Sequence, residues 1–249
     1  SIGPADRQAE LRIPGDISVD EVLPLVVALH GFSEYPFYVD GYFQGANSVD
    51  ANRHLLLTPD GTENQDGFFF WNGTPACCDF YGQKVDDVGY LSGLIDTAVS
   101  EHGADPDRVM LIGHSNGGFM SYRTAYDHSG TIAAIVSLAG ANHNEERPAP
   151  ENPVHILQIH GTADGTIAYE GDDIQGNEYP SALASVTRWA SYNGCSTSGA
   201  DRELRDLEAT IDGHETSVLL FKQGCKRGGS SELWTIAGGS HVPNLSDTF

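Results

Sequence analysis

The chain has 249 residues, of which 39% are hydrophobic, and it has no apolar run near the roughly 18 residues that a membrane-spanning helix needs. Thirteen Lys and Arg stand against 35 Asp and Glu, so the formal net charge is −22, and such a surface repels the phosphates of nucleic acids. We therefore expect neither a membrane protein nor a nucleic-acid-binding protein.

Short apolar runs alternate with amphipathic stretches along the whole chain, which is typical of an α/β domain with a mainly parallel sheet. Most of the strand runs are continuously apolar, as expected where helices cover both faces. Strands are predicted at Leu25–Leu29, Leu55–Thr58, Val109–Gly113, Ile132–Leu138, Val154–His160, Ser217–Phe221 and Glu232–Ile236. Helices are predicted at Val88–His102, Asn116–His128 and Ser181–Asn193. We expect one α/β domain over residues 1–249.

Two irregular stretches stand out: 60–82 is long, and 142–153 is polar and rich in proline. Long loops in a compact domain are usually functional or mobile. Neither loop can hold a helical cap domain. We therefore expect no large cap and a binding cleft that opens to solvent.

Four cysteines are present, at positions 77, 78, 195 and 225. They form no CxxC pair and the histidines show no metal-ligand spacing, so no zinc site is predicted. We favour a Cys195–Cys225 disulfide, which closes a loop of roughly 30 residues. Cys77 and Cys78 could pair with each other, stay free or pair elsewhere, and the alternative is that all four are buried thiols. Disulfides form in oxidising compartments, so the sequence favours a secreted protein.

Gly113-His114-Ser115-Asn116-Gly117 matches the G-x-S-x-G motif. The motif follows a predicted strand and precedes a predicted helix, which is the setting of a nucleophile elbow. Its glycines allow a sharp turn, and the helix N-terminus favours developing negative charge. Ser115 is therefore the predicted nucleophile; the alternative is a glycine-rich turn with a structural serine.

A serine hydroxyl needs a general base, and that base needs an orienting carboxylate. In proteins with such an elbow, these residues follow later strands in the order Ser, Asp or Glu, His. Asp164 comes shortly after the strand Val154–His160, and His241 comes after Glu232–Ile236. We predict that they complete a catalytic triad.

Other acidic and histidine side chains compete for these roles. Asp172 and Asp173 lie in a loop that is far from the strand end, and His143 follows an earlier strand. His160 ends a strand, and we interpret it as a structural histidine.

An oxyanion hole in this setting uses the N–H of the residue after the nucleophile and an N–H from an early loop. The first donor is Asn116. The turn Leu29-His30-Gly31-Phe32 supplies the second, from Phe32 or, as an alternative, Ser33. An ordinary strand-ending turn is the other interpretation.

Aromatic residues cluster at two nearby stretches, Tyr35 to Phe37 and Phe68–Trp71. They could form a subsite for a cinnamoyl ring or a hydroxyacyl chain, or they could simply pack the loops. From this region and the elbow, Tyr35, Trp71 and His114 are the candidate substrate-lining residues.

Taken together, these motifs resemble the secreted α/β-hydrolase esterases of the feruloyl/acetylxylan esterase and polyhydroxybutyrate-depolymerase-like type. The matching segments are Leu-His-Gly (29–31), Thr-Pro-Asp-Gly-Thr (58–62), Trp71-Asn72, Val-Asp-Asp-Val-Gly-Tyr-Leu (85–91), Gly-His-Ser-Asn-Gly-Gly-Phe-Met-Ser (113–121), His-Gly-Thr-Ala-Asp (160–164), Trp189-Ala190, Asn193-Gly194-Cys195 and Glu-Leu-Trp-Thr-Ile-Ala-Gly-Gly-Ser-His (232–241).

The resemblance implies a serine carboxylesterase with Ser115, Asp164 and His241 as its triad, and it supports the Cys195–Cys225 pairing. It implies no cofactor, and an ester substrate that is a feruloylated or acetylated polysaccharide or a polyester chain. Members of this family often continue the histidine loop with Trp-Pro, whereas this chain has Val242-Pro243. The substrate preference of typical members is therefore not carried over.

Two other functions remain open at this stage. Gly-x-Ser-x-Gly-Gly also suits serine oligopeptidases, although their usual additional N-terminal domain is not seen in this sequence. A non-enzymatic binding protein on the same scaffold usually lacks a triad residue, and all three are present here. The sequence predicts no particular protein partner.

Overall fold

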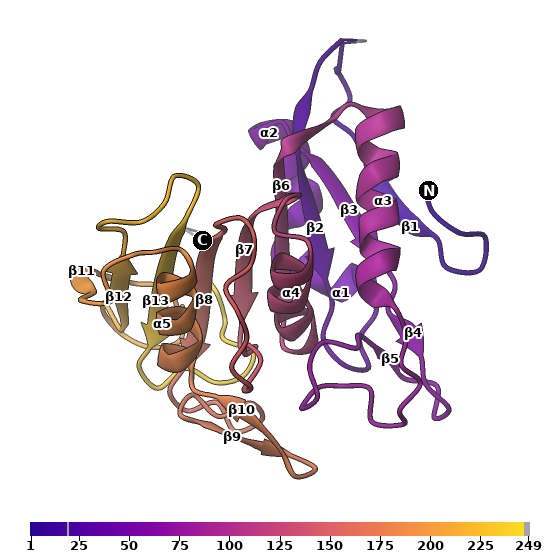
Figure 1. Cartoon of the computed structure of the whole chain (residues 1–249). Coiled ribbons are helices and arrows are strands. Elements are labelled where there is room, and N and C mark those ends of the chain that lie inside the picture. Colours follow the sequence, from indigo (N-terminus) through magenta and orange to yellow (C-terminus); the bar gives the residue numbers. More distant parts are fainter. Residues whose placement is uncertain (19, 247–249) are drawn as a thin grey trace.

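Nine strands form one twisted sheet in the computed structural model, which describes residues 1–18 and 20–246 (Figure 1). Their order across the sheet is β1-β3-β2-β6-β7-β8-β13-β12-β11. The strands are β1 (Ala9–Arg12), β2 (Leu23–Leu29), β3 (Leu55–Pro59), β6 (Ala104–His114), β7 (Ile132–Leu138), β8 (His155–Gly161), β11 (Ala200–Arg205), β12 (Thr216–Phe221) and β13 (Ser230–Ile236).

The central strands of this sheet, in the order β3-β2-β6-β7-β8-β13, run parallel to one another. At one edge β1 pairs antiparallel with β3, and at the other β12 and β11 continue the sheet antiparallel. The predicted mainly parallel sheet is confirmed. All seven predicted strands are present, although Ser217–Phe221, within β12, is antiparallel.

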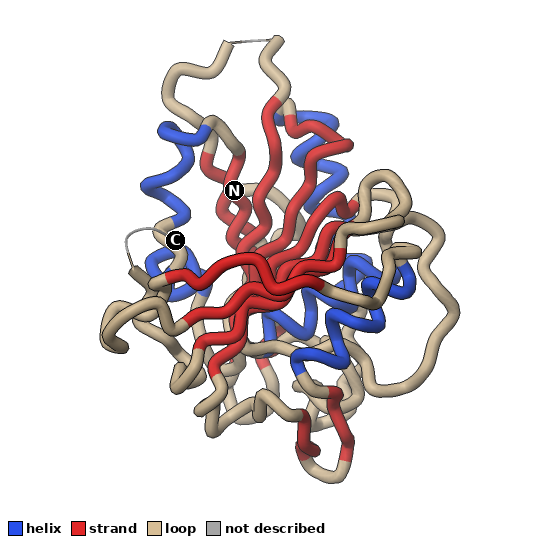
Figure 2. Tube along the Cα trace, turned by 90° about the vertical axis from the view of Figure 1, so that its left-hand side faces the viewer, coloured by secondary structure: helices blue, strands red, loops and turns tan. Residues whose placement is uncertain are grey.

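Within the described residues, five helices pack on the sheet: α1 (Pro36–Tyr42), α2 (Gly45–Asn52), α3 (Asp87–His102), α4 (Asn116–Asp127) and α5 (Ala182–Tyr192). Alternate side chains of β2 point to opposite faces. Leu25 and Val27 belong to a core shared with α3 and α4, whereas Ala28 packs with Val39 of α1 and Val49 of α2. Helices thus cover both faces, as Figure 2 shows, and the predicted fold class is confirmed.

Local hydrogen bonds explain where the long helices begin and end. Asp86 accepts a hydrogen bond from the Gly89 N–H at 2.9 Å and caps the start of α3, and Gly103, with φ 74°, is the C-cap that follows it. Ser181 caps α5 by accepting from the Ala184 N–H at 3.0 Å. These are the polar N-caps and the glycine C-cap that sequence patterns make recognisable.

Two small hairpins lie beyond the carboxyl ends of the parallel strands. They are β4 (Thr62–Glu63) with β5 (Phe69–Phe70), and β9 (Gly171–Ile174) with β10 (Asn177–Pro180). Figure 1 places both at the lower end of the sheet. Among the described residues, no helix is both long and apolar enough to cross a membrane.

Both cysteine pairs form disulfides. Cys195 and Cys225 join the segment after α5 to the segment after β12, as favoured from the sequence. Cys77 is bonded to Cys78, which resolves the three alternatives for that pair.

Candidate active site

The elbow lies where β6 ends and α4 begins. Ser115 has φ 52° and ψ −119°, a conformation that L-residues rarely adopt and that tight functional turns hold in place. Its N–H donates to the Leu138 carbonyl at 2.8 Å, which ties the turn to β7. A Cβ at Gly113 or Gly117 would collide with neighbouring main chain, so the elbow requires glycine at both positions. The Ser115 side chain does not cap α4.

Asp164 and His241 come together across two neighbouring parallel strands. Asp164 follows β8 and His241 follows β13, and the two loops are joined by a hydrogen bond from the Ala163 N–H to the Gly239 carbonyl at 2.9 Å. His241 Nδ1 lies 2.8 Å from Asp164 Oδ2. Because an ionised carboxylate only accepts, Nδ1 is the protonated nitrogen and Nε2 is left as the basic one.

The Asp164 carboxylate is saturated with donors. Its Oδ1 accepts from the N–H groups of Thr166 and Ile167, at 2.8 and 2.9 Å. Burial by itself would raise the pKa of Asp164, but the hydrogen bonds from His160 and His241 outweigh it and hold that pKa well below its usual range. The group is therefore a fixed negative charge under the imidazole of His241.

His160 is a further neighbour of this carboxylate that sequence reasoning interpreted only as structural. Its Nε2 donates to the Ile167 carbonyl at 2.8 Å and lies 3.2 Å from Asp164 Oδ2. Its Nδ1 accepts from Gln158 Nε2 at 3.1 Å. The His160 ring is thus fully engaged, and its spacing of four residues from Asp164 was the only sign of the contact in the sequence.

The turn after β2 has two N–H groups already in use. The Gly31 N–H donates to Glu34 Oε2 at 2.9 Å, and the Ser33 N–H donates to the Phe69 carbonyl at 2.8 Å. Phe32 lies between them. The Ser33 alternative for an oxyanion donor therefore has its N–H occupied.

Asn116, the residue after the elbow serine, is held by its own side chain. Its Oδ1 accepts from the Trp71 N–H at 2.7 Å, and its Nδ2 donates to the Trp71 carbonyl at 2.9 Å. Asn116 and Trp71 are both fully buried. The first turn of α4 is thereby fixed against the segment that follows β5.

His114 and Glu34 connect the turn after β2 to the His241 loop. His114 Nε2 donates to the His241 carbonyl at 2.9 Å, and the two rings lie 4.9 Å apart. On the other side, Glu34 Oε2 lies 3.9 Å from His114 Nδ1. Burial would raise the pKa of Glu34, but the contacts with His114 and the Gly31 N–H lower it. No motif in the sequence indicated Glu34.

The candidate substrate-lining residues have three different environments. Tyr35 is 48% exposed and stacks on Phe37 with ring centroids 5.7 Å apart. His114 is buried and supports the His241 loop, as described above. Trp71 is fully buried and its Nε1–H donates to the His30 carbonyl, so its ring supports the Asn116 contact and does not face solvent.

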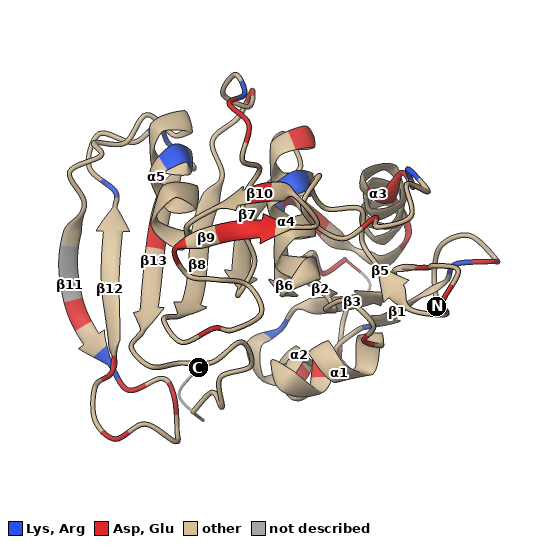
Figure 3. Cartoon of the chain, turned by 90° about the horizontal axis from the view of Figure 1, so that it is seen from below, with Lys and Arg blue, Asp and Glu red and all other residues tan. Residues whose placement is uncertain are grey.

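The competing residues lie apart from this arrangement. Asp172 and Asp173 are exposed on β9, an acidic strand in Figure 3. His143 is buried, 3.4 Å from Glu145, and burial lowers its pKa to about 4. In the described part of the chain, no group of His, Cys, Asp and Glu is arranged to hold a metal ion.

Two curated relatives are esterases. Feruloyl esterase B from Piromyces equi is 26% identical over 245 residues, which is 95% of this chain and 42% of that protein. The bifunctional acetylxylan esterase/xylanase XynS20E from Neocallimastix patriciarum is 28% identical over 166 residues, 67% of this chain and 22% of that protein. The chain thus spans less than half the length of these two relatives, and they confirm the resemblance to the feruloyl and acetylxylan esterase type.

A solved structure and a family model agree with this result. The acetyl xylan esterase from Aspergillus awamori superposes with a TM-score of 0.64 at 13% identity, over 96% of this chain and 90% of that one, which supports the fold. The model of the phospholipase/carboxylesterase family matches residues 84–215, more than half of the chain and the part that holds Ser115 and Asp164. The chain therefore belongs to the phospholipase/carboxylesterase family.

Proposed function

We propose that this protein is a serine carboxylesterase in which Ser115, His241 and Asp164 form the catalytic triad. The observation that carries the proposal is the 2.8 Å contact between His241 Nδ1 and Asp164 Oδ2, on loops that follow neighbouring strands of a sheet with Ser115 at its elbow. Carboxylate, imidazole and serine in this order are the components of an activated nucleophile.

The reaction proceeds through an acyl-enzyme. Ser115 Oγ attacks the ester carbonyl while His241 Nε2 takes its proton, and the C=O bond opens to an oxyanion. When the oxyanion collapses, the C–O bond to the alcohol breaks and His241 gives its proton to the leaving oxygen. Water then repeats the sequence on the acyl-enzyme, with His241 as base, and releases the acid and free Ser115.

The oxyanion is received by the N–H groups of Phe32 and Asn116. Support comes from the hydrogen bonds already described: the N–H groups of Gly31 and Ser33 have acceptors in the fold, and Asn116 is held in place by Trp71. Removing one such donor typically costs about 2.7–4 kcal/mol of transition-state stabilisation. Donors fixed before substrate arrives need no reorganisation during the reaction.

The substrate class we propose is a feruloyl or acetyl ester of a plant polysaccharide. The names of the two relatives favour it. Two disulfides favour an extracellular protein. The predicted action on polyesters has no counterpart in those names.

Initial rates on a panel test this proposal. The panel contains p-nitrophenyl acetate, methyl ferulate, acetylated xylan, polyhydroxybutyrate and a peptide library, with Ser115→Ala as the control. We expect hydrolysis of acetyl or feruloyl esters that is lost in Ser115→Ala, and covalent labelling of Ser115 by a fluorophosphonate. Peptide cleavage without ester hydrolysis, or the absence of labelling, would contradict the proposal.

A further inference from the structure

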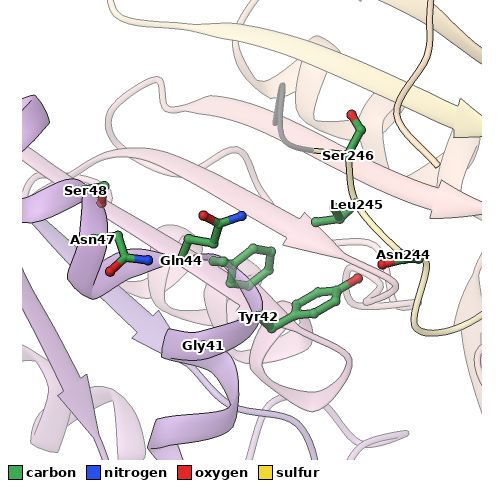
Figure 4. A pocket seen from close by; sticks show the side chains of 9 residues that line it. Gly41, Tyr42, Gln44, Asn47, Ser48, Asn244, Leu245 and Ser246 are labelled. Carbon is green, nitrogen blue, oxygen red and sulfur yellow. The ribbon is translucent and has the colours of Figure 1, made fainter. Parts of the chain in front are cut away.

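A cavity of about 500 Å³ lies between the junction of α1 with α2 and the segment that follows the His241 loop (Figure 4). Its polar lining comes from Tyr42, Gln44, Asn47, Ser48, Asn244 and Ser246. None of the described residues that line it is charged, although the chain carries 35 acidic residues. The volume is within the range of about 300–1,000 Å³ that is usual for small-molecule sites.

Three primary amides are available in this cavity. The side chains of Gln44, Asn47 and Asn244 have no hydrogen-bond partner within the described residues. In Figure 4, Gln44 and Tyr42 extend from the helical side toward Leu245 and Asn244 on the facing segment. Each amide offers two donors and one acceptor oxygen, a set that matches neighbouring hydroxyl groups, which both donate and accept.

The backbone at Gln44 is held in an unusual conformation. Gln44 has φ 51° and ψ 31°, in the left-handed region that favours glycine, and it joins α1 to α2. Such residues persist where the surrounding structure fixes them, and they cluster at ligand sites. This turn directs the Gln44 side chain away from α1 and into the cavity.

The cavity is one side chain away from the proposed catalytic site. The Tyr42 hydroxyl donates to the Pro243 carbonyl at 2.6 Å, and the Tyr42 ring lies 5.7 Å from the His114 ring. The Asn244 N–H donates to buried Glu208 at 2.6 Å, which fixes the facing segment. Tyr42 therefore stands between this space and the side chain of His114, which contacts His241.

We propose that this cavity is a subsite for a neutral sugar ring, the part of the substrate that carries the ester. The inference rests on the proposed function, because it assigns the alcohol side of the same reaction. Free amides and an uncharged lining favour a polyhydroxylated neutral ring. An acidic sugar is disfavoured because the protein, with its net charge of −22, repels the carboxylate that such a sugar carries.

Two substrates with the same acyl group test the inference. Acetylated xylo-oligosaccharide and p-nitrophenyl acetate differ only in the alcohol part. For the double variant Gln44→Ala/Asn47→Ala we expect the KM for the oligosaccharide to rise about tenfold, the effect of one or two lost hydrogen bonds. The KM and kcat of this variant for p-nitrophenyl acetate should stay within about twofold of the wild-type values. Asn52→Ala, on the same helix but outside the cavity lining, is the matched control.

A direct binding measurement separates this inference from the proposed function. Free xylotetraose is titrated into Ser115→Ala protein and followed by NMR, with a galacturonate tetramer as the charged comparison. We expect chemical-shift changes at residues 41–48 and 244–246 with the neutral sugar alone. These changes should disappear when Gln44→Ala and Asn47→Ala are combined with Ser115→Ala. This result stands even if the wild type hydrolyses no ester. Equal KM changes on both substrates, no change on either, or xylotetraose binding that the double variant retains would overturn the inference.

Discussion

His160 Nε2 lies 3.2 Å from Asp164 Oδ2, the same oxygen that faces His241 Nδ1 at 2.8 Å. With two main-chain N–H groups on Oδ1, the carboxylate has donors on all sides. Its lowered pKa means that it stays ionised well below neutral pH. Protonation of this carboxylate is therefore not what limits the acid side of the pH–rate profile near neutral pH.

Asp164→Asn should lower kcat by about 10⁴-fold, because a neutral amide neither holds the required imidazole tautomer nor stabilises the imidazolium. The asparagine oxygen can still accept from the N–H groups of Thr166 and Ile167, so we expect the fold to persist. Stopped assays with p-nitrophenyl acetate measure the loss, and circular dichroism checks the fold. Asp172→Asn, on exposed β9, should leave the rate unchanged; a loss below tenfold in Asp164→Asn would remove it from the triad.

Glu34 should matter through the acceptor that it gives to the Gly31 N–H. We expect Glu34→Gln, which keeps an oxygen there, to retain kcat within a few-fold. Glu34→Ala frees the turn that carries Phe32, and kcat should fall about 10- to 100-fold, less than the 10²–10³ lost with an oxyanion donor itself. KM for a small ester should hardly change. Equal kcat values for the two variants, at equal melting temperature, would show that this contact does not position the turn.

Stability should fall between neutral pH and pH 4. Burial lowers the pKa of His30 and of His143 to about 4, against about 6.5 when unfolded. The unfolded chain therefore binds more protons in this window, so the free energy of unfolding decreases as the pH falls. Each histidine contributes up to about 3 kcal/mol to the decrease. Asp164 acts in the same direction at lower pH, as it is protonated.

Urea unfolding at pH 7, 5.5 and 4.5 measures this dependence. His143→Phe should reduce this dependence, because phenylalanine binds no proton in the unfolded chain. The fold should persist, because the ring nitrogens of His143 have no hydrogen-bond partner to lose in the described structure. An unfolding free energy that is flat from pH 7 to 4.5, or a His143→Phe variant with the dependence of the wild type, would contradict the assignment.

Removing the Cys195–Cys225 disulfide should lower the free energy of unfolding by about 2–5 kcal/mol. The bond closes a separation of 30 residues and ties the end of α5 to the antiparallel edge of the sheet. The variant is Cys195→Ser/Cys225→Ser, because a reducing agent would also open the Cys77–Cys78 bond. Thermal melts should show the loss as a lower melting temperature, while the rates of ester hydrolysis at 25 °C stay unchanged. An unaltered melting temperature would show that the disulfide does not stabilise this edge of the sheet.

The strands of the sheet interior were predictable because they are continuously apolar. The edge strands β1 and β11 were not, since their sequences contain several charged residues, as in Ala9-Glu10-Leu11-Arg12. Helices α1 and α2 were missed for a different reason: both are short and contain glycine, and α2 consists mainly of small and polar residues. Their burial comes from the sheet they cover and not from an amphipathic pattern of their own.

The candidate site was predictable where strand order decides it. Parallel strands end at one edge of a sheet, so residues that follow β6, β8 and β13 had to be neighbours, and the structure brings Asp164 and His241 into contact. Their catalytic roles remain predictions. The contact of Glu34 depends on how its side chain turns within the loop after β2, which no spacing in the sequence encodes, and the contact of His160 left only its four-residue spacing from Asp164 as a sign.

The double hydrogen bond between Asn116 and Trp71 sets a limit on redesign. Any insertion or deletion in the segment after Phe70 would shift the residue next to the elbow serine, and so would alter turnover along with selectivity. Directed evolution toward new esters should therefore hold this segment constant and randomise the exposed positions around Tyr35 and Gln44, where specificity can change while the elbow stays in place.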